Sequence, residues 1–193
     1  MTNGSGFSRR ALIGTGIAAT GSLAFSAGAQ VPARQDDTAV WVAKQQIAEL
    51  RQLYGFATDL IGSGESVSIE EGRSIYRRIF TTDAAIGAAN VESVTGPDAW
   101  VDVVLGALKF YGSTQHLIGT QYVDVHALPD ADGQGGAASM RSYLQAWHAK
   151  PDGELWLFIG TYHDEASYSK EHGWQISKMV LEQVSEDRRQ LGS

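Results

Sequence analysis

Four long segments in the second half of the chain alternate between apolar and polar residues, and they constrain the fold more than any other feature. They cover residues 114–126, 137–149, 155–165 and 173–183. Turn sequences at 128–136 and 151–153 separate the first three, so these strands are expected to pair antiparallel. The third segment is apolar at both parities, for example at Trp156, Leu157 and Phe158. Such a strand is typically covered on both faces, so the sequence predicts a sheet packed on two sides.

The first half of the chain predicts three helices. An apolar stripe with steps of three and four residues runs through Val40, Ala43, Ile47, Leu50, Tyr54, Ala57 and Ile61. Gly62 and Gly64 end this helix, and Ser68 with Glu71 forms a capping box for a second one. Residues 84–91 predict a short strand, and Pro97 opens the third helix. Three helices followed by a strongly curved, mixed or antiparallel sheet predict an α+β cone with the helices in its concavity.

Composition fits one soluble domain, which we place at residues 39–193 after a flexible lead-in at 30–38. The chain has 193 residues, of which 43% are hydrophobic and 19% charged. It contains no cysteine, which excludes disulfides, thiolate metal sites and cysteine nucleophiles. No Gly-rich phosphate loop, serine nucleophile elbow or tight metal-ligand spacing is present, so we expect neither a cofactor nor a metal.

The first 29 residues predict an export signal. Arg9 and Arg10 precede a mildly apolar run at 11–27, and Ala27-Gly28-Ala29 has the small residues that a signal peptidase reads. This is the pattern of twin-arginine export to the periplasm, with a mature protein starting near Gln30. The processed chain would carry 13 basic and 22 acidic residues, a net charge of −9. A surface with this much negative charge repels nucleic acid and anionic lipid. We therefore expect neither nucleic-acid binding nor stable membrane association after processing.

Two histidines stand at inward-facing positions of the predicted strands. His116 lies in Thr114-Gln115-His116-Leu117-Ile118-Gly119, and His148 has the parity of Leu144 and Ala146 on the next strand. Two imidazoles in one pocket could carry out acid–base chemistry, because imidazole exchanges protons near neutral pH. The alternative is that each is a hydrogen-bonded core residue. His126 and His172 are expected at the surface, and His163 could face inward.

These elements and motifs resemble the SnoaL-like and scytalone-dehydratase-like branch of the nuclear-transport-factor-2-like superfamily. The resemblance spans residues 40–181. The strand of His116 is similar to the one that bears the first catalytic histidine of scytalone dehydratase, and His148 falls where that family keeps a second. Asp59 matches the aspartate that pairs with the first histidine, and Tyr54 matches a tyrosine of bile-acid dehydratases. Two further motifs, Gly160-Thr161-Tyr162-His163-Asp164 and Gly173-Trp174-Gln175-Ile176, are similar to a signature of the last two strands.

The resemblance implies a cofactor-independent lyase that eliminates a small group, water or formaldehyde, from a small aromatic or phenolic molecule. His116, oriented by Asp59, would remove a proton. His148 would protonate or position the leaving group, and Tyr54 would polarise an oxygen of the substrate. Phe56, Leu144, Tyr162 and His163 are expected to line the cavity.

Other functions remain open at this point. The same cavity suits an isomerase like ketosteroid isomerase, a hydrolase, or a domain that binds a hydrophobic ligand without changing it.

The outward side of the sheet predicts an oligomer. Tyr143 and Trp147 fall at outward positions of the second long strand, and the third strand adds an apolar outer face. Monomers seldom expose a patch of this kind. The relatives that the chain resembles bury that face in a trimer, so we expect a homotrimer, with a dimer as the second choice.

Overall fold

The computed structural model describes residues 35–88 and 91–190, so the predicted export signal lies outside the described residues. The elements are α1 (Gln35–Gly62), α2 (Ser66–Ile79), β1 (Phe80–Ala88), β2 (Val91–Thr95), α3 (Pro97–Leu108), β3 (Ser113–Ala127), β4 (Ala137–Ala149), β5 (Glu154–Ser169) and β6 (Gly173–Gln190). All three predicted helices and all four long strands are present. The predicted α+β fold is confirmed.

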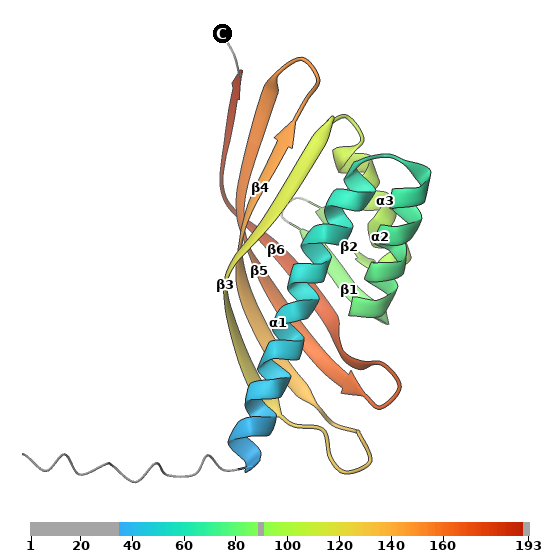
Figure 1. The fold of residues 1–193 in the computed structure, drawn as a ribbon, viewed down its shortest axis with the longest axis vertical. Coiled ribbons are helices and arrows are strands. Elements are labelled where there is room, and N and C mark those ends of the chain that lie inside the picture. Colours follow the sequence, from blue (N-terminus) through green and yellow to red (C-terminus); the bar gives the residue numbers. More distant parts are fainter. Residues whose placement is uncertain (1–34, 89–90, 191–193) are drawn as a thin grey trace, which may run out of the picture. The chain divides into compact units, whose positions relative to one another are not determined.

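The strands form one mixed sheet of six in the order β2-β1-β6-β5-β4-β3. All neighbouring strands pair antiparallel except β1 and β6, which are parallel. The four long strands curve, and the helices lie on one side of them (Figure 1). No helix among residues 35–88 and 91–190 lies on the opposite side of the long strands (Figure 1). This arrangement makes a pocket between the helices and the concave face possible.

The stripe on α1 packs the helix against the sheet. Its residues from Ala43 to Ile61 are buried, with exposed fractions of 8% or less. Gly55 allows the helix to approach β3 closely, because a Cβ at this position would lie 3.1 Å from the carbonyl oxygen of His116. The helix therefore runs beside the edge strand β3 and covers it (Figure 1).

Several element ends differ from the sequence-based expectation. Helix α1 begins at Gln35, so the last four residues of the predicted lead-in are helical. Acidic residues at 36 and 37 favour a first helical turn, which the apolar pattern alone does not register. The predicted capping box is wrong, because α2 begins at Ser66 with Glu65 at its N-cap and no side-chain cap bond. Strand β1 begins at Phe80, four residues before the strand predicted at 84–91.

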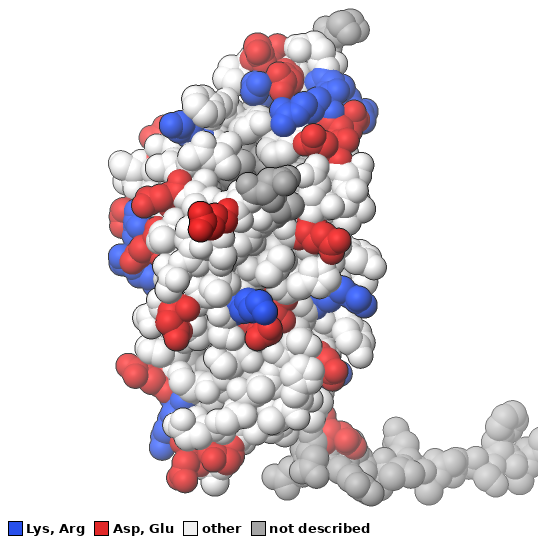
Figure 2. All heavy atoms as spheres, turned by 180° about the vertical axis from the view of Figure 1, so that it is seen from behind, with Lys and Arg blue, Asp and Glu red and all other residues white. Residues whose placement is uncertain are grey.

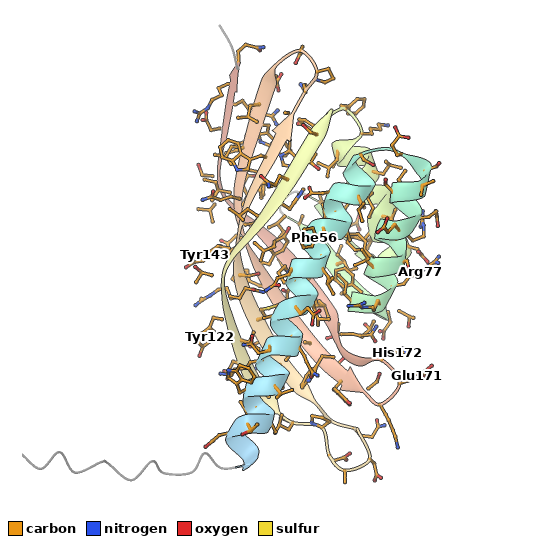
Figure 3. The ribbon with its side chains drawn as sticks, in the orientation of Figure 1. Phe56, Arg77, Tyr122, Tyr143, Glu171 and His172 are labelled. Atoms are coloured by element: carbon orange, nitrogen blue, oxygen red, sulfur yellow. The ribbon has the colours of Figure 1, made fainter. Side chains whose placement is uncertain are left out.

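The outer side of the sheet carries large exposed side chains. Tyr122, Tyr143 and Trp147 have exposed fractions of 62%, 55% and 37%. In Figure 3, Tyr122 and Tyr143 point away from the helices, from the side of the sheet that no helix covers. Acidic and basic side chains are interspersed on the side drawn in Figure 2, which presents no continuous basic surface among the described residues. No helix within residues 35–88 and 91–190 is long and apolar enough to cross a membrane.

Candidate active site

Asp59 and His116 form a hydrogen-bonded pair between α1 and β3. The Nδ1 atom of His116 lies 2.8 Å from Oδ1 of Asp59. The backbone N–H of His116 donates to Oδ2 at 3.0 Å, and the hydroxyl of Thr114 donates to Oδ1 at 2.9 Å. Because the carboxylate accepts a hydrogen bond from Nδ1–H, the lone pair of a neutral His116 lies on Nε2. The predicted contact between Asp59 and His116 is therefore present, and its geometry fixes the orientation of the imidazole.

This carboxylate also anchors the helix to the sheet. β3 is an edge strand of the described sheet, so the backbone N–H of His116 has no neighbouring strand on its free side to accept its hydrogen bond. Asp59 accepts that hydrogen bond instead. Asp59 occupies this position because Gly55, one turn earlier, lets the two backbones approach. The side chain of Asp59 is 27% exposed and that of His116 is 7% exposed, so the imidazole is the more protected partner.

His148 lies beside His116 on the neighbouring strand. Register pairs Thr114 with His148 and His116 with Ala146, so both imidazoles project from the concave face. Their ring centres are 5.3 Å apart and their planes are at 84°. The ring of Trp156 stacks on His148 at 4.5 Å, and Tyr111 lies 5.2 Å away on another side.

Burial and the neighbouring His116 lower the pKa of His148 to about 4. The burial removes water that would stabilise the imidazolium, and a second imidazole nearby adds repulsion. His148 is consequently neutral near pH 7 and is a poor proton donor there. Of the two roles that the sequence left open for it, the structure favours positioning over protonation of a leaving group.

A pocket of about 180 Å³ joins the two histidines to the centre of the fold. Leu144 and Tyr162, predicted to line the cavity, do line it, and so does Tyr54. The remaining walls are mostly apolar and include Trp100, Val104, Leu108, Trp156 and Phe158. Such a cavity favours an apolar or aromatic guest of modest size.

Three tyrosines pack together at one end of this pocket. Tyr54 stacks on Tyr76 at 5.2 Å and meets Tyr162 edge-on at 5.4 Å. The hydroxyl of Tyr54 accepts a hydrogen bond from Nε1 of Trp100 at 3.0 Å, and it also has hydrogen-bond interactions with Tyr76 and Tyr162. Burial raises the pKa of Tyr76 and of Tyr162 well above the usual value, so both stay protonated. This end of the pocket therefore offers hydroxyl groups rather than charge.

A buried ion pair between Arg51 and Asp164 packs against the rings of Tyr54 and Tyr162. The sequence analysis did not predict this pair. Nε of Arg51 donates to Oδ2 of Asp164 at 3.1 Å, and a second guanidinium nitrogen bonds to the other carboxylate oxygen. Both side chains are fully buried. The guanidinium lies 3.9 Å from the ring centre of Tyr162 and 4.4 Å from that of Tyr54. Burial lowers the pKa of Arg51, but Asp164 outweighs this effect, so the pKa is raised and Arg51 stays charged.

Two residues expected to line the cavity lie elsewhere. Phe56 is 69% exposed and lines a second, outer groove of about 320 Å³ between α1 and β3, which Asp59 and His116 also line. Figure 3 labels this side chain on α1. His163 faces outward and bonds to Glu182 at 3.1 Å, because successive residues of a strand alternate faces and Tyr162 faces inward. His126 and His172 are exposed, as predicted.

Within the described ranges, no group of three or more His, Asp or Glu side chains is placed to hold a metal ion. Asp59 and His116 are a pair, and His148 directs Nδ1 to the backbone carbonyl of Trp156.

Comparisons with known proteins agree with this architecture. Residues 73–180 match the family described as SnoaL-like domain. No curated protein sequence matches the chain.

Solved structures with a similar fold come from several bacteria. A protein of Novosphingobium aromaticivorans, provisionally described as a scytalone dehydratase, is 18% identical with a TM-score of 0.62; the match covers 81% of this chain and 93% of that one. A hexachlorocyclohexane dehydrochlorinase of Novosphingobium barchaimii is 14% identical with a TM-score of 0.63, over 79% and 94% of the two chains. A nuclear-transport-factor-2-like protein of Salmonella enterica is 12% identical with a TM-score of 0.58, over 76% and 94%. At these identities the similarity establishes the fold.

Proposed function

This chain belongs to the SnoaL-like domain family, and we propose that it is a cofactor-independent lyase acting on a small aromatic molecule. The observation that carries the proposal is the oriented pair of Asp59 and His116 at an apolar pocket. A general base needs a fixed imidazole with a free nitrogen near the substrate, and this pair supplies one. Two proteins of similar structure are described as a dehydratase, provisionally, and as a dehydrochlorinase; both descriptions are of eliminations and support the same reaction type.

The proposed reaction begins with proton removal by Nε2 of His116. The electron pair of the broken bond forms a new double bond, and the leaving group departs with its own electron pair. Where hydroxide is the leaving group it takes a proton to become water, and the imidazolium of His116 holds the one just removed. Where formaldehyde is lost, His116 would instead remove the proton of a hydroxymethyl O–H, whose electron pair forms the carbonyl of formaldehyde. The pair of the broken C–C bond then stays with the remaining molecule, which takes the proton back from His116. His148 is not the source, because its pKa of about 4 keeps it unprotonated. The hydroxyl of Tyr54, held by Trp100, would donate a hydrogen bond to an oxygen on which negative charge develops.

Mass spectrometry of incubated substrates is the test of this proposal. The panel should contain small phenols with a hydroxyl or hydroxymethyl group on the side chain, each incubated with wild type and with His116→Ala. A product lighter by water or by formaldehyde, formed by wild type alone, supports the lyase. An unchanged mass with a new retention time indicates an isomerase, and a gain of water indicates a hydrolase. Unchanged ligand that co-elutes with the protein indicates a binding domain.

We propose that the uncovered side of the sheet is an interface in a homotrimer. Trp147 and Tyr143 on β4 and Tyr122 on β3 supply aromatic side chains there, and Leu157 of β5 has the same outward parity. Aromatic side chains are enriched where protein surfaces pack together, which favours a second copy of the chain as the occupant.

Trp147→Asp is expected to dissociate this assembly, because the substitution would bury an unpaired carboxylate. Light scattering at micromolar concentration measures the change in mass. Trp41→Asp is the matched control, since Trp41 is 62% exposed on α1 and is expected to leave the mass unchanged. A wild-type mass close to that of one processed chain would rule the trimer out.

We also propose export by the twin-arginine route to the periplasm. Replacing Arg9 and Arg10 together by lysine is expected to leave unprocessed precursor in the cytoplasm, because that route reads the arginine pair. Cell fractionation and N-terminal sequencing measure the outcome, and the wild-type protein should begin near Gln30. Normal processing of the double variant would indicate the general secretory route instead.

A further inference from the structure

The tautomer of His148 is fixed by its backbone partner. Its Nδ1 atom lies 3.2 Å from the carbonyl oxygen of Trp156. A carbonyl oxygen only accepts hydrogen bonds, so Nδ1 must carry the proton. In a neutral imidazole the lone pair then belongs to Nε2. This nitrogen is therefore an acceptor.

No described residue donates a hydrogen bond to Nε2 of His148. The hydrogen bonds of its side chain consist of the one to Trp156, while its other neighbours are the rings of Trp156, Tyr111 and His116. The residue is only 3% exposed to bulk water, and it lines the pocket. Nε2 is not one of the described buried polar atoms that lack a partner, so it is open to the pocket, where water or the hydroxyl of a guest can donate to it.

The surroundings of His148 disfavour its imidazolium on balance, because burial, His116 and Arg188 lower its pKa more than the carbonyl of Trp156 and Asp59 raise it. The ionisable side chains that affect it are His116, Asp59 and Arg188. Asp59 is occupied by His116, and Arg188 is a cation that stacks over Trp156, 4.7 Å from its ring centre. His148 thus stays neutral with its lone pair directed to the pocket side.

We propose that His148 is a fixed hydrogen-bond acceptor that selects substrates carrying a hydroxyl group on an aromatic ring. The hydroxyl donates to Nε2, and the ring lies among Trp156, Phe158 and Ala146. A hydroxyl suits this acceptor better than an ammonium group, because the pocket walls are apolar and Arg188 lies close by. The assignment rests on the proposed function only in taking this pocket as the substrate site. It makes His148 the residue that recognises the phenol, while His116 remains the base.

A pair of probes of equal shape tests the assignment. In 4-methylphenol a hydroxyl replaces one methyl group of 1,4-dimethylbenzene, so the two differ in the donor and hardly in size. Wild-type protein is expected to bind 4-methylphenol about tenfold or more tightly, although the hydrocarbon gains more from leaving water. Isothermal titration calorimetry measures both affinities. Equal binding, tighter binding of the hydrocarbon, or no binding of the phenol would overturn the proposal.

Two variants and one spectrum separate recognition from general damage to the pocket. His148→Phe keeps a planar ring but has no acceptor, so the preference for the phenol should disappear. His148→Gln offers an amide oxygen near the position of Nε2 and should restore part of that preference. Nitrogen NMR of wild-type protein labelled in histidine should show His148 protonated at Nδ1 alone between about pH 5.5 and 8. A proton on Nε2 in that range would contradict the assignment.

These measurements need no turnover, so they fail or succeed separately from the lyase proposal. Preference for the phenol without any product would leave the acceptor assignment standing and remove the lyase. Equal turnover of phenols and their methyl ethers would leave the lyase standing and remove the acceptor assignment.

Discussion

His116→Ala is expected to lower turnover by about 10²–10⁴-fold, the usual effect of losing a general base. Its folded structure should persist, because the alanine backbone still donates its N–H to Asp59. The rate is measured on whichever compound the mass-spectrometric panel identifies, and circular dichroism checks the fold. His163→Ala is the control. His163 lies on the other face of the sheet with Glu182 as its partner, so its loss should leave turnover unchanged.

Asp59 and His116 should behave as one unit in a double-mutant cycle. Asp59→Asn retains an oxygen for the backbone N–H of His116, but its amide can turn an N–H towards Nδ1 and favour the wrong tautomer. The single variants should each be strongly impaired, and the double variant should be hardly worse than His116→Ala. Strictly additive losses would mean that the carboxylate acts independently of the imidazole. Near-wild-type turnover of His116→Ala would remove His116 from the mechanism.

Local patterns were sufficient to predict the elements that carry the site. The strand predicted at 137–149 has the same bounds as β4, because its alternation is unbroken and turn sequences limit it on both sides. The stripe on α1 is buried as expected, since a period of three and four residues defines one helical face. Inward parity for His116 and His148 follows from the same alternation, so both histidines could be placed from the sequence.

The errors come from information that no local pattern contains. Strict alternation would place Thr120 on the same inward face as His116. A bulge between Gly119 and Gln121 shifts the register, however, and Thr120 is exposed. Tyr162 and His163 were both expected in the cavity, but neighbouring strand residues face opposite sides. Arg51 and Asp164 are 113 positions apart, and a charged residue next to an apolar stripe gives no indication of its distant partner.

The close approach of the α1 backbone to β3 could not be predicted from the sequence either. Gly55 stands within a helical pattern, where it only lowers helix propensity. In the structure it is the residue that lets α1 approach β3, and this approach brings Asp59 to His116. The pairing of those two residues was inferred from the family resemblance, whereas its physical cause is a missing side chain one turn away.

Asp164→Leu is expected to lower the free energy of unfolding by about 3–5 kcal/mol, because it leaves the guanidinium of Arg51 buried and unpaired. A loss of that size is a large share of the roughly 5–15 kcal/mol that stabilises a typical domain, so the variant is expected to unfold at a lower urea concentration than wild type. Equilibrium unfolding in urea measures the change. Asp98→Asn is the control, since Asp98 is half-exposed and pairs with Arg73 and Arg77 at the surface, where such pairs contribute about 0–1 kcal/mol.

The double variant Arg51→Met with Asp164→Leu separates the cost of a lone charge from the value of the pair. Methionine and leucine can fill the space without any desolvated charge, so most of the lost stability should return. The rings of Tyr54 and Tyr162 would then lose the cation that lies on them, at 4.4 and 3.9 Å. If the pair serves to hold these tyrosines, the double variant should be stable yet bind 4-methylphenol more weakly than wild type. Stability and binding that both return to wild-type values would mean that the charges are dispensable to the pocket.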